Sequence, residues 1–188
     1  MKVDPATGLL IGVRQVLSPH FDARPTNVEP ELIVVHGISL PPGEFGGPWI
    51  DRLFTGNLPP DAHPYFREAA APGRRVSAHV LIRRDGQIVQ YVPFSGRAWH
   101  AGQSEYRGRA ACNDFSIGIE LEGSDHIPYT DAQYDQLARV AGALFDAYPA
   151  ASPEHVTGHS DIAPVRKTDP GPAFDWIRFR RLLASESR

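Results

Sequence analysis

The segment Leu32–His36, with the sequence LIVVH, constrains the fold more than any other part of the chain. Four consecutive large aliphatic residues leave no polar face, which is typical of a strand that is buried on both faces of a sheet. The run ends on His36, and the residues from Ser39 to Pro48 are too rich in proline and glycine for a helix or strand. The sequence therefore predicts a buried strand that delivers a histidine to the start of a loop.

Two further strand regions are predicted downstream. Residues 77–84 and 87–92 flank the dipeptide Asp85-Gly86, whose residues tolerate the positive φ that a tight hairpin turn needs. In Ser116–Glu122, apolar side chains alternate with the others at the two-residue period of a strand. The apolar side chains of this strand therefore share one face, and its two glutamates lie on the other.

Helical patterns alternate with these strands. The segment Thr130–Gln133 is a capping box, and the apolar residues behind it recur at spacings of three and four. Shorter helices are predicted at Trp49–Phe54 and from a cap at Asp175 through Leu183. We therefore expect a single α/β domain over residues 1–188, with a mixed central β-sheet and helices packed around it.

Charge and composition exclude several classes of partner. The formal net charge of -3 gives no basic footprint, so nucleic acid is not an expected partner. The apolar run at residues 9–13 is too short for a membrane span, and the first residues lack the pattern of a secretory signal. Cys112 is the only cysteine, which permits a reducing compartment. We expect a cytoplasmic protein with no membrane contact and no obligate protein partner.

Most of the eight histidines have an ordinary interpretation. Four of them lie among polar or loop residues and are expected to be solvated: His20, His63, His126 and His155. His79 lies in a predicted strand, where a buried structural histidine is expected. His100, in RAWHAG, follows a tryptophan on a glycine-containing loop and could face a pocket.

His36 and His159 are candidate metal ligands because each ends or follows a structural element beside a glycine. A catalytic zinc ion typically has three protein ligands and a fourth position open to water, which two histidines and one carboxylate would satisfy. Asp161 and Asp169 are alternatives for the carboxylate. Asp161 is close to His159 in sequence, whereas Asp169 is braced by the following Pro170. Spacing does not decide between them, and Asp169 equally fits the start of a turn.

Several blocks of the chain together resemble the AmpD-type cytoplasmic zinc amidases, which are 1,6-anhydro-N-acetylmuramoyl-L-alanine amidases. These blocks are LIVVHGISLPPGEFGGPWID, SAHVLIRRDGQIVQYVPF, RAWHAG, CNDFSIGIELEG, YTDAQY and GHSDIAPVRKTDPGPAFDW. They cover nearly the whole chain in the order of the family. The resemblance implies the fold of the type 2 amidases, which is shared with phage lysozyme-amidases and peptidoglycan recognition proteins.

The resemblance also implies site residues. It implies one zinc ion per chain, bound by His36, His159 and Asp169, which favours Asp169 over Asp161. It implies Glu120 as the catalytic acid–base residue and Lys167 as a cation near the reacting carbonyl. From the residues alone, Glu120 equally fits a solvent-facing strand position, and Lys167 fits a surface ion pair. The family often has asparagine directly after the first zinc histidine, where this chain has Gly37.

The function that the resemblance implies is hydrolysis of the amide bond between 1,6-anhydro-N-acetylmuramic acid and L-alanine of the stem peptide, in peptidoglycan recycling. The expected partner is the anhydro-muropeptide. Tyr65, Arg75 and Trp99 are weaker candidates for substrate contacts, since arginine can meet carboxylates and tryptophan a sugar face; structural roles are the alternative. Two other functions are a non-catalytic muropeptide-binding module, which the complete ligand set argues against, and an amidase that acts on intact cell wall.

Overall fold

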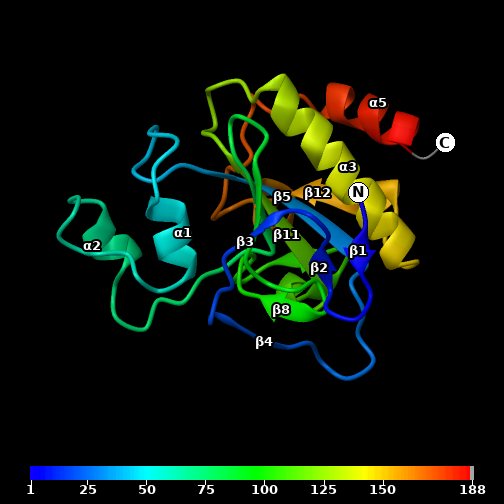
Figure 1. Cartoon of the computed structure of the whole chain (residues 1–188), viewed down its shortest axis with the longest axis horizontal. Coiled ribbons are helices and arrows are strands. Elements are labelled where there is room, and N and C mark those ends of the chain that lie inside the picture. The colour runs from blue at the N-terminus through cyan, green and yellow to red at the C-terminus, as the bar shows by residue number, and fades with distance from the viewer. Residues whose placement is uncertain (187–188) are drawn as a thin grey trace.

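The centre of the molecule is a six-stranded sheet with the strand order β12-β5-β11-β6-β7-β3. In this computed structural model, which describes residues 1–186, β5 (Leu32–Ile38) and β11 (Ser116–Glu122) pair in parallel over their whole length (Figure 1). Strands β12 and β6 flank this pair, also in parallel, whereas β6 and β7 pair antiparallel. The predicted mixed sheet in an α/β domain is therefore confirmed.

The remaining elements are short apart from two helices. The other strands are β1 (Val3–Asp4), β2 (Leu9–Leu10), β3 (Arg14–Gln15), β4 (Phe21–Ala23), β6 (Val80–Ile82), β7 (Ile88–Gln90), β8 (Gly96–Ala98), β9 (Glu105–Tyr106), β10 (Arg109–Ala110) and β12 (Val156–Gly158). The helices are α1 (Trp49–Phe54), α2 (Phe66–Ala69), α3 (Asp131–Ala147), α4 (His159–Ile162) and α5 (Trp176–Glu186), with 3-10 turns at Cys112–Asp114 and Pro153–His155.

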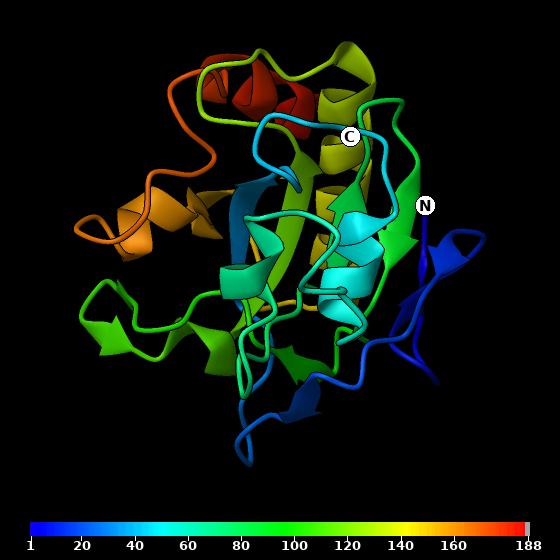
Figure 2. The same cartoon turned by 90° about the vertical axis from the view of Figure 1, so that its left-hand side faces the viewer.

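Different helices cover the two faces of the sheet. Helices α3 and α5 pack side by side over one face, as Figure 1 shows at the upper right. Their apolar side chains form one core with alternate residues of the central strands, such as Ile33, Val35 and Ile119. Helices α1 and α2 lie at the left of Figure 1, on the side that faces the viewer in Figure 2, and form a second core with residues such as Leu81 and Val89. Both faces of the central strands are thus buried, as their sequence predicts.

Most predicted elements are present with small differences in length. Helix α1 has the predicted bounds, and the Thr130 side chain accepts a hydrogen bond from Gln133 in the predicted capping box of α3. Gly86 has a φ of 85° in the predicted hairpin turn, although the flanking strands β6 and β7 are shorter than predicted. Asp175 accepts a hydrogen bond from the Arg178 N–H at the start of α5, which continues beyond Leu183.

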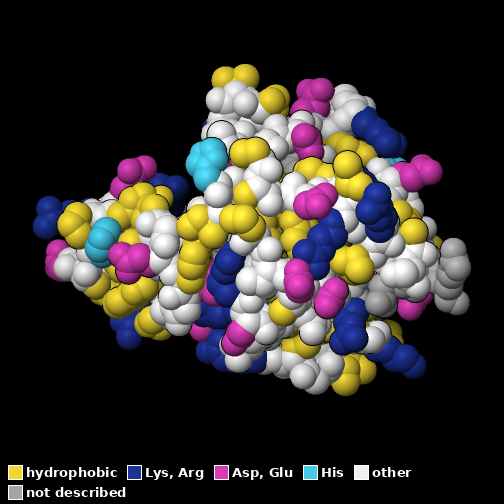
Figure 3. All heavy atoms as spheres, turned by 90° about the horizontal axis from the view of Figure 1, so that it is seen from above, with side chains coloured by type: hydrophobic (Ala, Val, Ile, Leu, Met, Phe, Trp, Pro, Cys, Tyr) yellow, Lys and Arg dark blue, Asp and Glu magenta, His cyan; other side chains and the backbone are white. Residues whose placement is uncertain are grey.

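The charges on one face and the lengths of the described helices bear on the expected partners. On the face seen in Figure 3, basic and acidic side chains are intermingled with apolar ones rather than gathered into one basic patch. Within residues 1–186, no helix is both long enough and apolar enough to cross a membrane.

The register of the parallel strands places the candidate residues together. Glu120 of β11 lies directly across from His36 of β5. Gly158, the last residue of β12, lies across from Val35 on the other side of β5. Since carboxyl ends of parallel strands meet at one edge of a sheet, His159 follows β12 at the edge where His36 and Glu120 lie.

Candidate metal centre and active site

Three donor atoms converge at this edge of the sheet. His36 Nδ1 lies 2.9 Å from His159 Nδ1. Asp169 Oδ2 lies 3.1 Å from each of the two nitrogens. Among residues 1–186, these three side chains are the group of histidines, cysteines and carboxylates that could hold a metal ion. Electron-rich atoms packed this closely need a proton or a cation between them, so the triangle is a candidate cation site.

The donor set fits a zinc ion. Zinc binds imidazole nitrogen and carboxylate oxygen at about 2.0–2.2 Å, which puts the ligand atoms of one tetrahedral ion about 3.3 Å apart. The separations of 2.9–3.1 Å in the triangle are close to that value. Two imidazoles and one carboxylate also match catalytic zinc sites, which keep one position open.

The protonation of the donors suits a metal as well. Burial lowers the pKa of His36 to about 4, so its imidazole is neutral at pH 7 and can bind a cation. Burial alone would raise the pKa of Asp169, but its contacts with the imidazoles of His159 and His36 outweigh burial and hold the pKa well below its ordinary value. Asp169 is therefore an ionised carboxylate at neutral pH.

Glu120 lies beside this group as a buried carboxyl. The residue is 8% exposed, and its Oε2 atom has no hydrogen-bond partner among the described residues 1–186. Burial raises the pKa of Glu120 well above its ordinary value, and the Asp169 carboxylate adds to this, while Lys167 opposes it. A solvent-facing position for Glu120 is wrong. A buried carboxyl with a free oxygen and a raised pKa is typical of a general acid–base residue.

A pocket of about 590 Å³ surrounds the donors. All five residues predicted as metal ligands or catalytic groups line it: His36, Glu120, His159, Lys167 and Asp169. Its size is within the range of sites for small ligands, and it is large enough for a sugar with part of a peptide. The arrangement can therefore place a cation, a carboxyl base and an ammonium group around one bond of a bound molecule.

The three weaker candidates differ in their placement. Tyr65 and Trp99 line the pocket. The Trp99 indole is held by a hydrogen bond from Nε1 to Asp22 Oδ1, 3.2 Å long. Arg75 is not brought to the pocket; its side chain is exposed, and its neighbour Arg74 lines the pocket instead. Two adjacent arginines in a loop cannot be told apart by sequence pattern, so contacts with substrate stay a prediction for Tyr65 and Trp99.

Sequence reasoning missed one wall of the pocket. The loop after β5 and the end of α1 supply Ser39, Leu40, Pro42, Leu53 and Phe54. The sequence offered one signal for this wall, which is that SLPPG follows His36 after two residues. A loop that leaves a ligand-bearing strand starts at the site. The lining also includes Asp125 and His126.

The other histidines do not join the donor group. His79 is buried, with Nδ1 accepting from the Gly118 N–H at 3.0 Å, which confirms its structural role. His126 is exposed, as predicted, although it lines the pocket. His63 and His155 are partly buried, and His20 is partly buried with its ring stacked on Trp99, so these three side chains are in partial contact with solvent.

Asp161 and Gly37 have local roles. Asp161 Oδ2 accepts from the Gly158 N–H at 2.8 Å at the start of α4, so this carboxylate caps a helix and lies outside the donor group.

A Cβ atom at Gly37 would lie 2.4 Å from Tyr129 Oη, which donates to the Pro170 carbonyl at 2.9 Å. The space beside Gly37 is thus filled by Tyr129, and any larger residue there requires this tyrosine to shift.

Comparison with known proteins connects this geometry to a family. Residues 26–172 match the family model described as N-acetylmuramoyl-L-alanine amidase. The 1,6-anhydro-N-acetylmuramyl-L-alanine amidase AmpD of Escherichia coli (strain K12) is 67% identical over 180 residues, which are 96% of this chain and 97% of that protein.

Two solved structures have the same architecture. The crystal structure of a selenomethionine derivative of AmpD is 64% identical and superposes with a TM-score of 0.93, covering 97% of this chain and 99% of that one. The amidase AmiD from E. coli, in complex with anhydro-N-acetylmuramic acid-L-Ala-D-gamma-Glu-L-Lys, is 30% identical with a TM-score of 0.59, covering 85% of this chain and 60% of that one. The matched family segment contains all five residues that surround the candidate cation site, so this chain belongs to the N-acetylmuramoyl-L-alanine amidase family of hydrolases.

Proposed function

We propose that this protein is a zinc-dependent amidase that cleaves the bond between 1,6-anhydro-N-acetylmuramic acid and L-alanine of the stem peptide. The convergence of His36, His159 and Asp169 beside the buried Glu120 is the observation that carries the proposal. The name of the E. coli relative and the molecule bound to AmiD support this choice of substrate. One amidase domain over residues 1–188, acting in cytoplasmic peptidoglycan recycling, completes the proposal.

An amide is a poor electrophile, so the site must activate water and stabilise negative charge on the carbonyl oxygen. When held by the three donors, zinc supplies Lewis acidity, which polarises a carbonyl and lowers the pKa of a bound water towards ~7. His36, His159 and Asp169 fix the position of this charge at the end of the sheet. The pocket walls then have to place the scissile amide against it.

Proton transfer belongs to Glu120 in this mechanism. In its ionised form, the free Oε2 atom accepts a proton from the attacking water. The same carboxyl then donates a proton to the departing amino group of L-alanine, which could not leave as an amide anion. Lys167, which lines the same pocket, places positive charge near the carbonyl oxygen as negative charge develops there.

The proposal is tested by incubating the zinc-loaded protein with an anhydro-muropeptide and measuring released peptide and free anhydro sugar by mass spectrometry. We expect both products, and a much lower rate with Glu120→Gln at equal zinc content. Binding of the muropeptide without any product, with zinc present, would instead indicate a non-catalytic binding module. A parallel reaction with reducing-end muropeptide and with intact cell wall measures substrate preference; faster release from intact wall would contradict the recycling role.

A further inference from the structure

The two-residue segment His100–Ala101 lies behind both histidine donors. His159 Nε2 lies 3.2 Å from the Ala101 carbonyl oxygen. A carbonyl oxygen can only accept, so His159 carries its proton on Nε2 and leaves Nδ1, which faces Asp169, free to bind a cation. His36 Nε2 lies 2.9 Å from His100 Nδ1. The Nε2 atoms of His36 and His159 therefore both contact this two-residue segment of the RAWHAG motif.

His100 is itself held in one orientation. Its Nε2 atom lies 3.2 Å from Ser116 Oγ at the start of β11. Its ring packs flat over Gly118, where a Cβ atom would lie 2.4 Å from the ring. When His36 Nδ1 binds a cation, His36 Nε2 carries the proton and donates to His100 Nδ1, and His100 Nε2 donates to Ser116. Glycine at position 118 is what leaves room for this chain of hydrogen bonds.

Asn113 fixes the same segment from the other side. Its Oδ1 atom accepts from the backbone N–H groups of both His100, at 3.1 Å, and Ala101, at 2.8 Å. Asn113 lies in the 3-10 turn Cys112–Asp114 directly before β11, so it is anchored on the central sheet. One side-chain oxygen thus sets the position of the ring that meets His36 and the carbonyl that meets His159.

We propose that His100 and Asn113 are positioning residues for the metal centre, which hold His36 and His159 in the ring orientation and tautomer that present both Nδ1 atoms to a zinc ion. The proposal rests on the zinc site proposed above. Hydrogen-bond partners of metal-binding histidines typically contribute 10–100-fold to metal affinity. Within the motifs RAWHAG and CNDF, His100 and Asn113 thereby acquire a role at the metal centre.

The test measures zinc affinity rather than turnover. Zinc dissociation constants would be determined by competition with a chromophoric chelator for wild type, His100→Phe and Asn113→Ala. His100→Phe keeps a flat ring over Gly118 but removes both ring hydrogen bonds, and Asn113→Ala removes the acceptor for two backbone N–H groups. We expect about 10–100-fold weaker zinc binding in each variant. Asn113→Asp, which retains the acceptor, should restore most of the affinity.

A matched control separates positioning from loop folding. Ser104 Oγ accepts from the Cys112 N–H and so braces the same loop without contacting either donor histidine. Ser104→Ala should leave zinc affinity near wild type, and the visible spectrum of the cobalt-substituted protein should change only in the His100 and Asn113 variants. Wild-type affinity and spectrum in both of those variants would overturn the proposal, as would an equal loss in Ser104→Ala. Failure of wild type to bind zinc would overturn the proposed function itself.

Discussion

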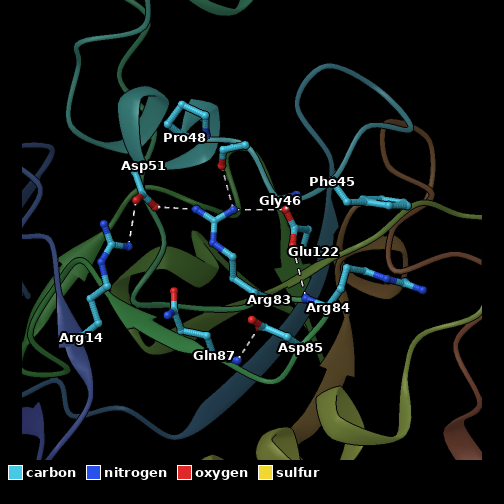
Figure 4. Close-up of a pocket in the computed structure, with 11 residues that line it drawn as sticks. Arg14, Phe45, Gly46, Pro48, Asp51, Arg83, Arg84, Asp85, Gln87 and Glu122 are labelled. Carbon is cyan, nitrogen blue, oxygen red and sulfur yellow. Dashed lines mark hydrogen bonds and ion pairs between the residues drawn. The ribbon is translucent and has the colours of Figure 1, made fainter.

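Glu120 and Glu122 lie two residues apart on β11 and on the same face, yet their carboxyl groups differ in their hydrogen-bond partners. Glu120 is 8% exposed and its Oε2 atom has no partner among residues 1–186. Glu122 is 2% exposed, and both of its oxygens are used (Figure 4). Oε1 accepts from the Gly46 N–H at 2.7 Å and from Arg83 Nη1 at 3.1 Å, and Oε2 accepts from the Arg84 N–H at 3.2 Å.

The surroundings of Glu122 form a closed network of charges. Arg83 also donates to the Gly47 carbonyl at 3.0 Å and to Asp51 Oδ1 at 3.0 Å. Asp51 lies in α1 and pairs with Arg14 as well. The network therefore joins the end of β11 to α1, whose last residues Leu53 and Phe54 line the pocket around the donors.

The two carboxyls differ in how far hydrogen bonds compensate the free-energy cost of their burial. A buried carboxylate without partners is unfavourable, whereas one with several hydrogen bonds from N–H groups is compensated. Of these two carboxyls, the one next to the donor triangle is left with a free oxygen, which a general base requires. The two regions should therefore respond in opposite ways to the same substitutions.

The largest effect should come from the removal of a donor next to Glu120. His36→Ala leaves two of three protein ligands, so we expect loss of most bound zinc together with activity. Metal analysis and the muropeptide assay measure the two losses. His126→Ala and His155→Ala are the controls, because both histidines lie outside the donor group, and their zinc content should match wild type. Full retention of zinc in His36→Ala would show that the ligands are assigned to the wrong residues.

Glu→Gln substitutions at the two positions should separate chemistry from structure. Glu120→Gln keeps size and removes the base, so kcat should fall by ~10²–10⁴-fold. KM should change little, because the lost interaction operates mainly in the transition state. Glu122 does not line the pocket around the donor triangle, so Glu122→Gln should keep kcat within a few-fold of wild type. If Glu122→Gln abolished turnover and Glu120→Gln did not, the base would be the other carboxyl.

Local patterns in the sequence account for most of the fold. The aliphatic run at 32–35 predicts a buried strand, and the capping box at Thr130 predicts the start of the long helix, because both depend on neighbouring residues only. The elements that no pattern predicted are very short, such as the pairs β4–β8 and β9–β10. These depend on which distant segments pack together rather than on local propensity.

Prediction of the site residues is limited in the same way, because some of their contacts join distant segments of the chain. Residue spacing left Asp161 and Asp169 open, because the choice depends on how the chain folds back after α4. The Ser160 N–H bonds the Asp169 carbonyl at 2.9 Å, which brings that carboxylate to His159, while Asp161 is used in the cap of α4. His100 could be suspected of facing a pocket, but its partner His36 is 64 residues away, and no local pattern predicts such a contact.

A smaller effect is expected on stability at Glu122. Glu122→Gln removes the charge from a buried set of hydrogen bonds and leaves Arg83 partly uncompensated. We expect the free energy of unfolding to fall by about 1–3 kcal/mol, measured by urea denaturation. Glu68→Gln is the matched control, since Glu68 pairs with Arg74 at a side-chain exposure of 83% and such a pair contributes ~1 kcal/mol at most. An equal loss in both variants would mean that the Glu122 network contributes no more than a surface ion pair.

The smallest expected effect has the opposite sign and concerns Glu120 in the metal-free protein. Burial raises the pKa of this carboxyl above its ordinary value of 4.5, so below pH 4.5 both the folded and the unfolded states hold the proton, and the carboxyl adds no pH-dependent penalty. As the pH rises above 4.5, the unfolded state releases the proton more readily, and the wild-type free energy of unfolding falls until the folded pKa is passed.

A glutamine at position 120 does not titrate, so the variant avoids this loss of stability. Glu120→Gln should therefore gain stability relative to wild type as the pH rises from 4.5 to 8, in urea denaturation of both metal-free proteins. A difference between the two proteins that stays constant, or shrinks, over this range would show that burial imposes no cost on the ionised carboxyl.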